Sequence, residues 1–162
     1  MTNSTISIVK LDSSEWQKYR NIRLEALEVE PGAFHETYEE EEKLSSTHWK
    51  QKLSDKNSIV IFAQSQGEVV GLMSLVTGEK DELEETAVIH ELYVNEAYRG
   101  RGVGKNLLNF LISEVKKDRR VKFLKLWVKD VQLPARRLYE SAGFKFTERA
   151  GEHTAIMEKE LF

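Results

Sequence analysis

One stretch of the chain constrains its fold more than any other: a strand pattern, a glycine-rich loop, a helix pattern and a second strand pattern follow in close succession. Residues 86–94 are rich in strand formers, and the loop Arg99-Gly100-Arg101-Gly102-Val103-Gly104 comes soon after them. Apolar side chains then recur every three or four residues as far as Val115, which predicts a helix with one buried face. Residues 121–128 predict the next strand. Strand, helix and strand in this order form a right-handed crossover, so the two strands should be parallel.

The rest of the chain predicts antiparallel strands and shorter helices. Two apolar runs, at 59–63 and 69–75, are separated by Gln66-Gly67 and should form a hairpin. We therefore expect an α+β fold, in which a mixed, mostly antiparallel twisted sheet with one parallel strand pair is flanked by helices. The remaining expected elements are a strand at 6–11, a helix at 16–30 behind a capping box from Asp12 to Glu15, helices at 47–53 and 134–142, a charged loop at 78–85, and a closing hairpin of 144–149 and 154–161.

Length and composition exclude several classes of protein. The 162 residues suit a single domain over 1–162, since a domain of this size buries roughly two-thirds of its unfolded surface. The chain has no cysteine, so a thiolate nucleophile or metal site is ruled out, and the scattered histidines predict no metal. A net charge of -3 argues against nucleic acid as a partner. No apolar run approaches the ~18 residues of a membrane span and no leader pattern opens the chain, so we expect a cytoplasmic protein.

The glycine loop has the chemistry of an anion site. Three glycines at the start of a helix allow backbone N–H groups to converge on a phosphate, and the helix dipole adds to the attraction. Two familiar nucleotide loops do not fit. A dinucleotide fingerprint that starts at Gly102 needs glycine where Leu107 stands, while a Walker loop needs glycine at Arg99 and Ser or Thr at Asn106.

The loop and its surroundings resemble the GNAT superfamily of acyl-CoA N-acyltransferases. Arg99, Arg101, Gly102 and Gly104 fit the Arg/Gln-x-x-Gly-x-Gly/Ala signature of that superfamily, and residues 135–144 (ARRLYESAGF) are similar to its late Leu-Tyr-x-x-x-Gly-Phe segment. The resemblance extends over most of the chain. It implies an N-acetyltransferase that transfers an acetyl or other acyl group from acetyl-CoA, its co-substrate, to a primary amine by direct attack in a ternary complex.

The resemblance also implies which residues bind the cofactor. The backbone of the strand at Leu92 and Val94 would run beside the pantetheine arm, with an N–H near Val94 pointing at the thioester oxygen. The loop would hold the pyrophosphate. One departure is Gln132, which stands where many members carry asparagine. The residues expected to bind coenzyme A are Leu92, Val94, Arg99, Arg101, Gly102, Val103, Gly104, Lys105 and Gln132.

Three residues are candidates for proton transfer. Tyr139 resembles the tyrosine of this superfamily that lies near the sulfur, and it would act as general acid; a core aromatic residue is the alternative. A lysine-like amine is neutral at pH 7 only about once in 2500, so the reaction also needs an acceptor for the amine proton. Glu91, directly or through a water, is the first choice. His90 is second, because strand alternation makes it face the other way.

The acceptor amine is not identified by the sequence. The acidic run that includes Glu39 would attract a cation, or form a solvated face, whereas Arg23 would attract an acidic group. Arg23, His90 and Glu39 are therefore the candidate substrate-binding residues of a small-molecule or peptide amine site. A catalytically idle acyl-CoA sensor and an interaction module that binds another phosphate ligand remain as alternatives, and the resemblance admits a homodimer.

Overall fold

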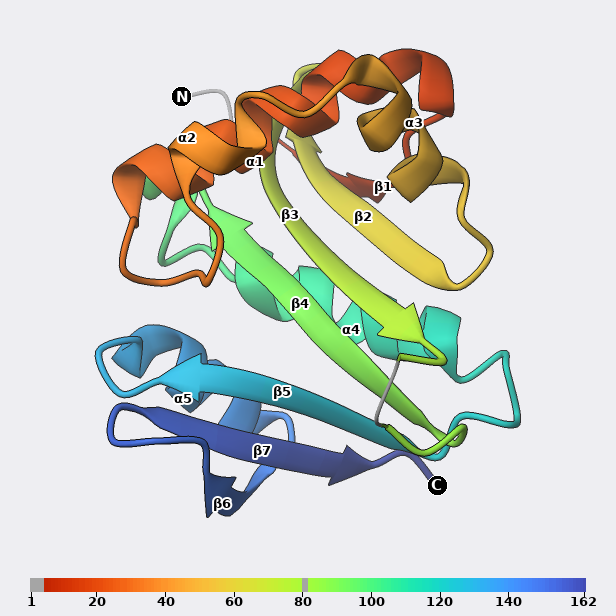
Figure 1. Cartoon of the computed structure of the whole chain (residues 1–162), viewed down its shortest axis with the longest axis vertical. Coiled ribbons are helices and arrows are strands. Elements are labelled where there is room, and N and C mark those ends of the chain that lie inside the picture. Colours follow the sequence, from red (N-terminus) through yellow and green to blue (C-terminus); the bar gives the residue numbers. More distant parts are fainter. Residues whose placement is uncertain (1–4, 80–81) are drawn as a thin grey trace.

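The computed structural model describes residues 5–79 and 82–162, which build one seven-stranded sheet with helices on both faces (Figure 1). The strand order is β1-β2-β3-β4-β5-β7-β6, and β4 and β5 form the parallel pair. The predicted fold class is thereby confirmed. The strands are β1 (Ile6–Val9), β2 (Ser58–Ser65), β3 (Glu68–Thr77), β4 (Thr86–Val94), β5 (Phe123–Lys129), β6 (Lys145–Arg149) and β7 (Thr154–Glu160).

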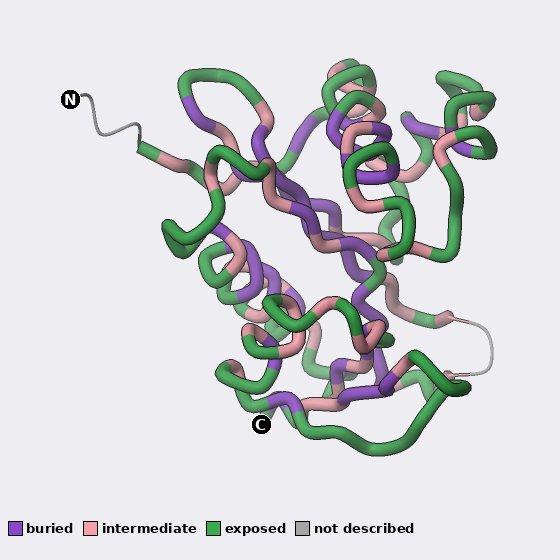
Figure 2. The backbone as a smooth tube through the Cα atoms, turned by 90° about the vertical axis from the view of Figure 1, so that its left-hand side faces the viewer, coloured by how far each residue is buried: buried purple, intermediate pink, exposed green. Residues whose placement is uncertain are grey.

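The helices divide into two layers. Helices α1 (Trp16–Val29), α2 (Tyr38–Glu41) and α3 (Ser46–Ser54) cover β1 to β4 on one face, while α4 (Val103–Val115) and α5 (Leu133–Ser141) lie behind the sheet (Figure 1). Each layer seals its own apolar core. The larger core contains the buried side of α4, and the smaller one packs Tyr19 of α1 against Trp49 of α3. Figure 2 shows the buried residues along the strands and on the helix sides that face them.

Local sequence signals explain several helix ends. Asp12 accepts the backbone N–H of Ser14 and the side chain of Glu15 reaches back, so the predicted capping box is present, although it opens a short 3-10 turn before α1. Pro134 lies in the first turn of α5, and Gly143, with φ +91, follows its end. The predicted loop at 78–85 includes residues 80 and 81, which lie outside the described residues.

Strand β4 has two irregularities near its C-terminal end. The parallel pairing with β5 runs only from Thr86 opposite Phe123 to Ile89 opposite Leu126, so the strands separate beyond Ile89. On the other side of β4, Ser74 of β3 pairs with Glu91 and the next residue pairs with Ile89. His90 is therefore an extra residue without a partner on β3, which is a β-bulge.

Candidate functional site

A cavity of about 570 Å³ opens where β4 and β5 separate. Its walls are the end of β4, the glycine loop and first turn of α4, the inner side of α5, and the segment after α1 that contains Gly32 and Ala33. Four chain segments that are far apart in the sequence thus meet at the open end of the parallel pair.

The glycine loop shapes one end of this cavity with its backbone. Gly100 and Gly102 have φ of +74 and +79, a conformation that glycine adopts without strain, and Gly102 is the N-cap of α4. The N–H groups of the first turn have no partner within the helix, because an α-helix leaves its first donors free. A Cβ added to Gly104 would lie 3.3 Å from Leu138 Cδ2, so the start of α4 packs closely against α5. This arrangement fits a pyrophosphate.

The last residues of β4 offer an open strand edge. Asn95 N–H donates to Val70 O at 2.8 Å, and pairing alternates in antiparallel strands, so the backbone groups of Leu92 and Val94 face away from β3. Beyond Ile89 no pairing with β5 occupies them. The carbonyl of Val94 accepts from Arg99 Nε at 2.8 Å, whereas the N–H groups face the side on which the strands separate. The N–H groups of Leu92 and Val94 are thus open to a ligand on this edge, and their contact with a thioester stays a prediction.

Eight of the nine residues predicted to bind the cofactor line this cavity. The exception is Arg101, whose guanidinium lies over the ring of Tyr98 at 5.5 Å. Arg99 lines the cavity, but it also donates to Glu30 at 2.7 Å, so part of its charge is already compensated. The lining residues from the prediction are Leu92, Val94, Arg99, Gly102, Val103, Gly104, Lys105 and Gln132.

Gln132, at the position where the resemblance led us to expect asparagine, lines the cavity. Its side-chain oxygen accepts the backbone N–H of Lys129 at 3.0 Å, which ties the start of α5 to the end of β5. The amide NH₂ is the part of the side chain left to contact a ligand.

Tyr139 lies in the core behind the cavity wall. Its ring meets Phe144 edge-on at 5.6 Å, and the side chain is buried, while its neighbours Ala135 and Leu138 line the cavity. Burial raises the pKa of the Tyr139 phenol, so the hydroxyl stays protonated at neutral pH. The structure does not place Tyr139 among the lining residues.

A second cavity, of about 260 Å³, lies between α1, α2, α3 and the strands β2 to β4, with Glu91 on its wall. The Glu91 carboxylate is 4% exposed and accepts the hydroxyl of Tyr19 at 3.0 and 3.2 Å. Arg23 Nε lies 3.3 Å and Lys52 Nζ 3.9 Å from the same carboxylate. Burial by itself raises the pKa of Glu91, but Lys52, Arg23 and the hydroxyls of Ser74 and Tyr19 together lower it below its ordinary value.

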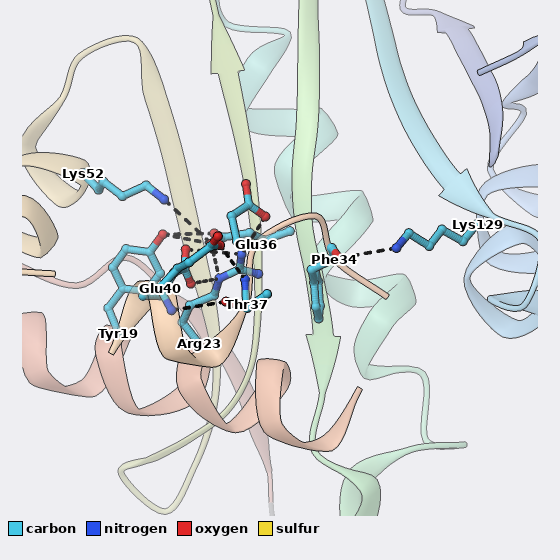
Figure 3. A network of polar contacts seen from close by, with 10 residues as sticks. Tyr19, Arg23, Phe34, Glu36, Thr37, Glu40, Lys52 and Lys129 are labelled. Carbon is cyan, nitrogen blue, oxygen red and sulfur yellow. Dashed lines mark hydrogen bonds and ion pairs between the residues drawn. The ribbon is translucent and has the colours of Figure 1, made fainter. Parts of the chain in front are cut away.

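Arg23 connects this cavity to the segment between α1 and α2. Its Nε donates to Glu41 at 2.7 Å and its Nη2 lies 3.2 Å from Glu36. The guanidinium also lies 4.7 Å from the ring centre of Phe34, whose carbonyl accepts from Lys129 at 3.4 Å (Figure 3). The segment that spans both cavities is thus held to α1 on one side and to β5 on the other.

The expectation for His90 is wrong in one respect. His90 and Glu91 both line the second cavity, although strict alternation would send them to opposite faces. The bulge is the physical reason, because an extra residue shifts the alternation by one position. The imidazole Nε2 lies 2.6 Å from Glu79.

Within the acidic run, the structure places Glu41 rather than Glu39 on a cavity wall. Glu39 is exposed and does not line either cavity, whereas Glu41 is buried and holds Arg23. Tyr19 and Lys52 were not predicted to belong to the site. Tyr19 lies one helical turn from Arg23 on the buried side of α1. A charged residue, Arg23, among the apolar residues of this side was the sequence signal that could have pointed to the buried polar network.

Two general properties concern the described residues alone. Over residues 5–79 and 82–162, no group of three His, Asp or Glu side chains is arranged to hold a metal ion, and the predicted metal independence stays a prediction. Within the same ranges no helix has the length and apolar character needed to cross a membrane.

Comparison with known proteins identifies the family of this chain. Residues 16–144 match the model of the acetyltransferase (GNAT) family. An uncharacterized N-acetyltransferase of Archaeoglobus fulgidus is 33% identical over 106 residues, which are 64% of this chain and 71% of that protein. One of Methanocaldococcus jannaschii is 28% identical over 117 residues, 71% of this chain but only 51% of that protein.

Solved structures agree in fold. A GNAT-family acetyltransferase of Streptococcus pneumoniae has a TM-score of 0.82 at 17% identity, covering 96% of this chain and 99% of that one. A putative acetyltransferase of Salmonella typhimurium, solved with its cofactor acetyl-CoA, has a TM-score of 0.80 at 20% identity, covering 98% and 95%. Because the family model matches residues 16–144, which are most of this chain, the chain belongs to the GNAT family of acetyltransferases.

Proposed function

We propose that this protein transfers an acetyl group from acetyl-CoA to a primary amine, by direct attack within a ternary complex. The observation that carries the proposal is the 570 Å³ cavity, in which the first-turn N–H groups of α4 and the open edge of β4 converge. Acetyl-CoA would supply the thioester. The chain would supply the anion cradle, a backbone donor for the thioester oxygen and two routes for protons.

The backbone does most of the work of binding in this proposal. The first turn of α4 would hold the pyrophosphate, with the charge of Lys105 beside it. The N–H of Val94 or Leu92 would polarise the carbonyl, as fixed dipoles do where negative charge develops. The NH₂ of Gln132 would contact the pantetheine arm from the opposite wall.

Glu91 would guide the proton of the incoming amine through a water. Its lowered pKa makes it a weak base, so it would act on an amine that is already partly neutral rather than strip a strongly basic one. His90 lies on the same cavity wall, and its Nε2 is 2.6 Å from Glu79. It is the second candidate for this role.

Tyr139 would donate a proton to the departing sulfur. Its raised pKa keeps the phenol in the donor form, and Ala135, one helical turn before it on α5, lines the cavity. A thiol has a pKa near 8.5, so the sulfur needs only modest help.

A thiol-release assay with acetyl-CoA and a panel of amines tests the function. We expect release that depends on an amine and gives an acetylated product of the expected mass. If calorimetry shows that acetyl-CoA binds while no amine stimulates release, the chain is an idle acyl-CoA sensor. Equal binding of ATP and coenzyme A would instead favour a general phosphate-binding module. A cytoplasmic location, a homodimer, a single domain over 1–162 and the preference for acetyl over longer acyl groups stay predictions.

A further inference from the structure

Arg23 has a buried nitrogen that the protein does not satisfy. The side chain is 3% exposed, and its Nε and Nη2 contact carboxylates. For Nη1, by contrast, the described residues offer no hydrogen-bond acceptor, and the neighbouring Phe34 ring carries no oxygen or nitrogen. Buried donors without a partner are rare, because they lose their hydration and gain nothing in exchange. An oxygen atom from outside the described chain would complete this guanidinium.

The second cavity also has unbalanced charge. Among the described residues its wall carries three carboxylates, of Glu36, Glu41 and Glu91, against the guanidinium of Arg23 and the ammonium of Lys52, a surplus of one carboxylate. The Lys52 side chain is 37% exposed, and its ammonium lies 3.9 Å from Glu91. A ligand with one positive charge would balance the cavity.

The cavity adjoins the proposed acetyl site. Glu91 lines the second cavity and Leu92, the next residue of β4, lines the first. The segment between α1 and α2 is shared in the same way, with Ala33 on the first cavity and Glu36 on the second. A molecule seated beside Arg23 and Glu91 would therefore lie one residue along β4 from the strand edge proposed to hold the thioester.

We propose that the acceptor is an α-amino amide, such as the N-terminal residue of a peptide, with its ammonium drawn to the carboxylates and its carbonyl oxygen bound to Arg23 Nη1. This proposal rests on the acetyltransferase function proposed above. The amide supplies one positive charge and one oxygen acceptor on neighbouring carbons, and its amine is only weakly basic. A linear diamine has no oxygen for Arg23, and a free amino acid adds a carboxylate to a cavity that already has a surplus of them.

The transfer itself balances without a further reagent. The nitrogen of the neutral α-amine bonds to the carbonyl carbon of the thioester, and the carbon–sulfur bond breaks with its electron pair going to sulfur. The amine loses one proton, which water beside Glu91 takes up, and the thiolate gains one from Tyr139 or solvent.

Four small amines separate the candidates. Glycinamide carries the ammonium and the carbonyl, propargylamine has similar basicity but no carbonyl, glycine carries a carboxylate, and 1,4-diaminobutane carries a second ammonium. We expect kcat/KM for glycinamide to exceed that for each of the others at least tenfold. A propargylamine value equal to that of glycinamide, or a higher value for glycine or the diamine, overturns the proposal.

A binding measurement separates this proposal from the proposed function. Calorimetry with the coenzyme A-loaded protein should show glycinamide binding at least tenfold more tightly than propargylamine, whether or not acetyl transfer occurs. If glycinamide binds selectively but no thiol is released, the enzyme proposal fails and the recognition stands. If both amines are acetylated without selectivity in either readout, the enzyme proposal stands and the recognition fails.

The variant Arg23→Lys tests the residue itself. Lysine keeps the charge but has one nitrogen in place of the three of the guanidinium. The ratio of kcat/KM for glycinamide to that for propargylamine should therefore fall toward one. A ratio unchanged in the folded variant would rule out Arg23 as the group that recognises the carbonyl. Should the variant fail to fold, as judged by circular dichroism, the binding ratio of the unaltered protein decides the proposal.

Discussion

Replacing Arg23 with methionine should strongly destabilise the fold. The guanidinium lies 2.7 Å from Glu41 and 3.3 Å from Glu91, and both carboxylates are buried. Methionine keeps much of the apolar stem but leaves these carboxylates with Lys52 as the remaining cation, 3.9 Å from Glu91. Removing one partner of a buried ion pair costs about 3–5 kcal/mol. At this chain length such a loss lowers the midpoint of thermal unfolding by roughly 10 °C.

The destabilisation should depend on pH. In the unaltered protein the pKa of Glu91 is lowered on balance, because its neighbours outweigh the effect of burial. A group with a lowered folded pKa contributes stability above its unfolded pKa, about 4.3 for glutamate, and loses it as the pH falls through the folded pKa. Without Arg23 one of the causes that lower this pKa is lost, so the pKa of Glu91 rises and the variant regains stability by protonation as the pH falls. The difference in unfolding free energy should therefore be largest near pH 7 and shrink toward pH 4.

Urea unfolding followed by tryptophan fluorescence measures this difference, since Trp49 is fully buried beside the network. Arg20→Met is the matched control, because Arg20 lies on the same helix and, among the residues that the structure describes, bonds only the backbone carbonyl of Glu42, at 3.3 Å. We expect that control to cost less than about 1 kcal/mol. A loss below about 1 kcal/mol for Arg23→Met, or a loss independent of pH, would refute the argument that this arginine compensates the buried carboxylates.

Three further substitutions test separate parts of the structure. Gly71→Ala puts a Cβ 2.9 Å from Tyr93 O, so urea unfolding should show a loss of about 1–3 kcal/mol, and a neutral result would mean that β3 and β4 are less closely packed. Gly104→Val pushes against Leu138, 3.3 Å from the new Cβ, and calorimetry should show coenzyme A binding at least ~10-fold more weakly; unchanged affinity contradicts the cradle. Tyr139→Phe should lower kcat by less than the ~10² typical of general acids, and no change at all removes Tyr139 from the mechanism.

The fold was predictable because its signals are local. The apolar repeat from Val103 to Val115, with glycines before it and a strand on each side, leaves one right-handed arrangement of the parallel pair. The capping box at Asp12 and the glycine after α5 likewise depend on neighbouring residues alone. Such signals need no knowledge of distant contacts.

The site was only partly predictable, because the partners of its charged residues lie far from them in the sequence. Arg99 was expected to serve a phosphate, but it also holds Glu30 and the carbonyl of Val94. Within the acidic run, helix α2 turns Glu41 inward and leaves Glu39 outside, a difference that depends on where the short helix begins. Neither the pairing of Arg99 with Glu30 nor the burial of Glu41 can be inferred from composition or residue spacing.

The bulge at His90 shows how one residue determines two features of the site. Up to Ile89, β4 pairs with β5 and its side chains alternate regularly. The extra residue bends the strand and increases its twist, as bulges do, and the pairing with β5 ends at this point. It also turns His90 and Glu91 toward the same cavity, while Leu92 returns to the other face of the sheet. The strand edge proposed for a thioester and the polar wall proposed for an amine thus both begin at this bulge, and deleting His90 should close the first and displace the second together.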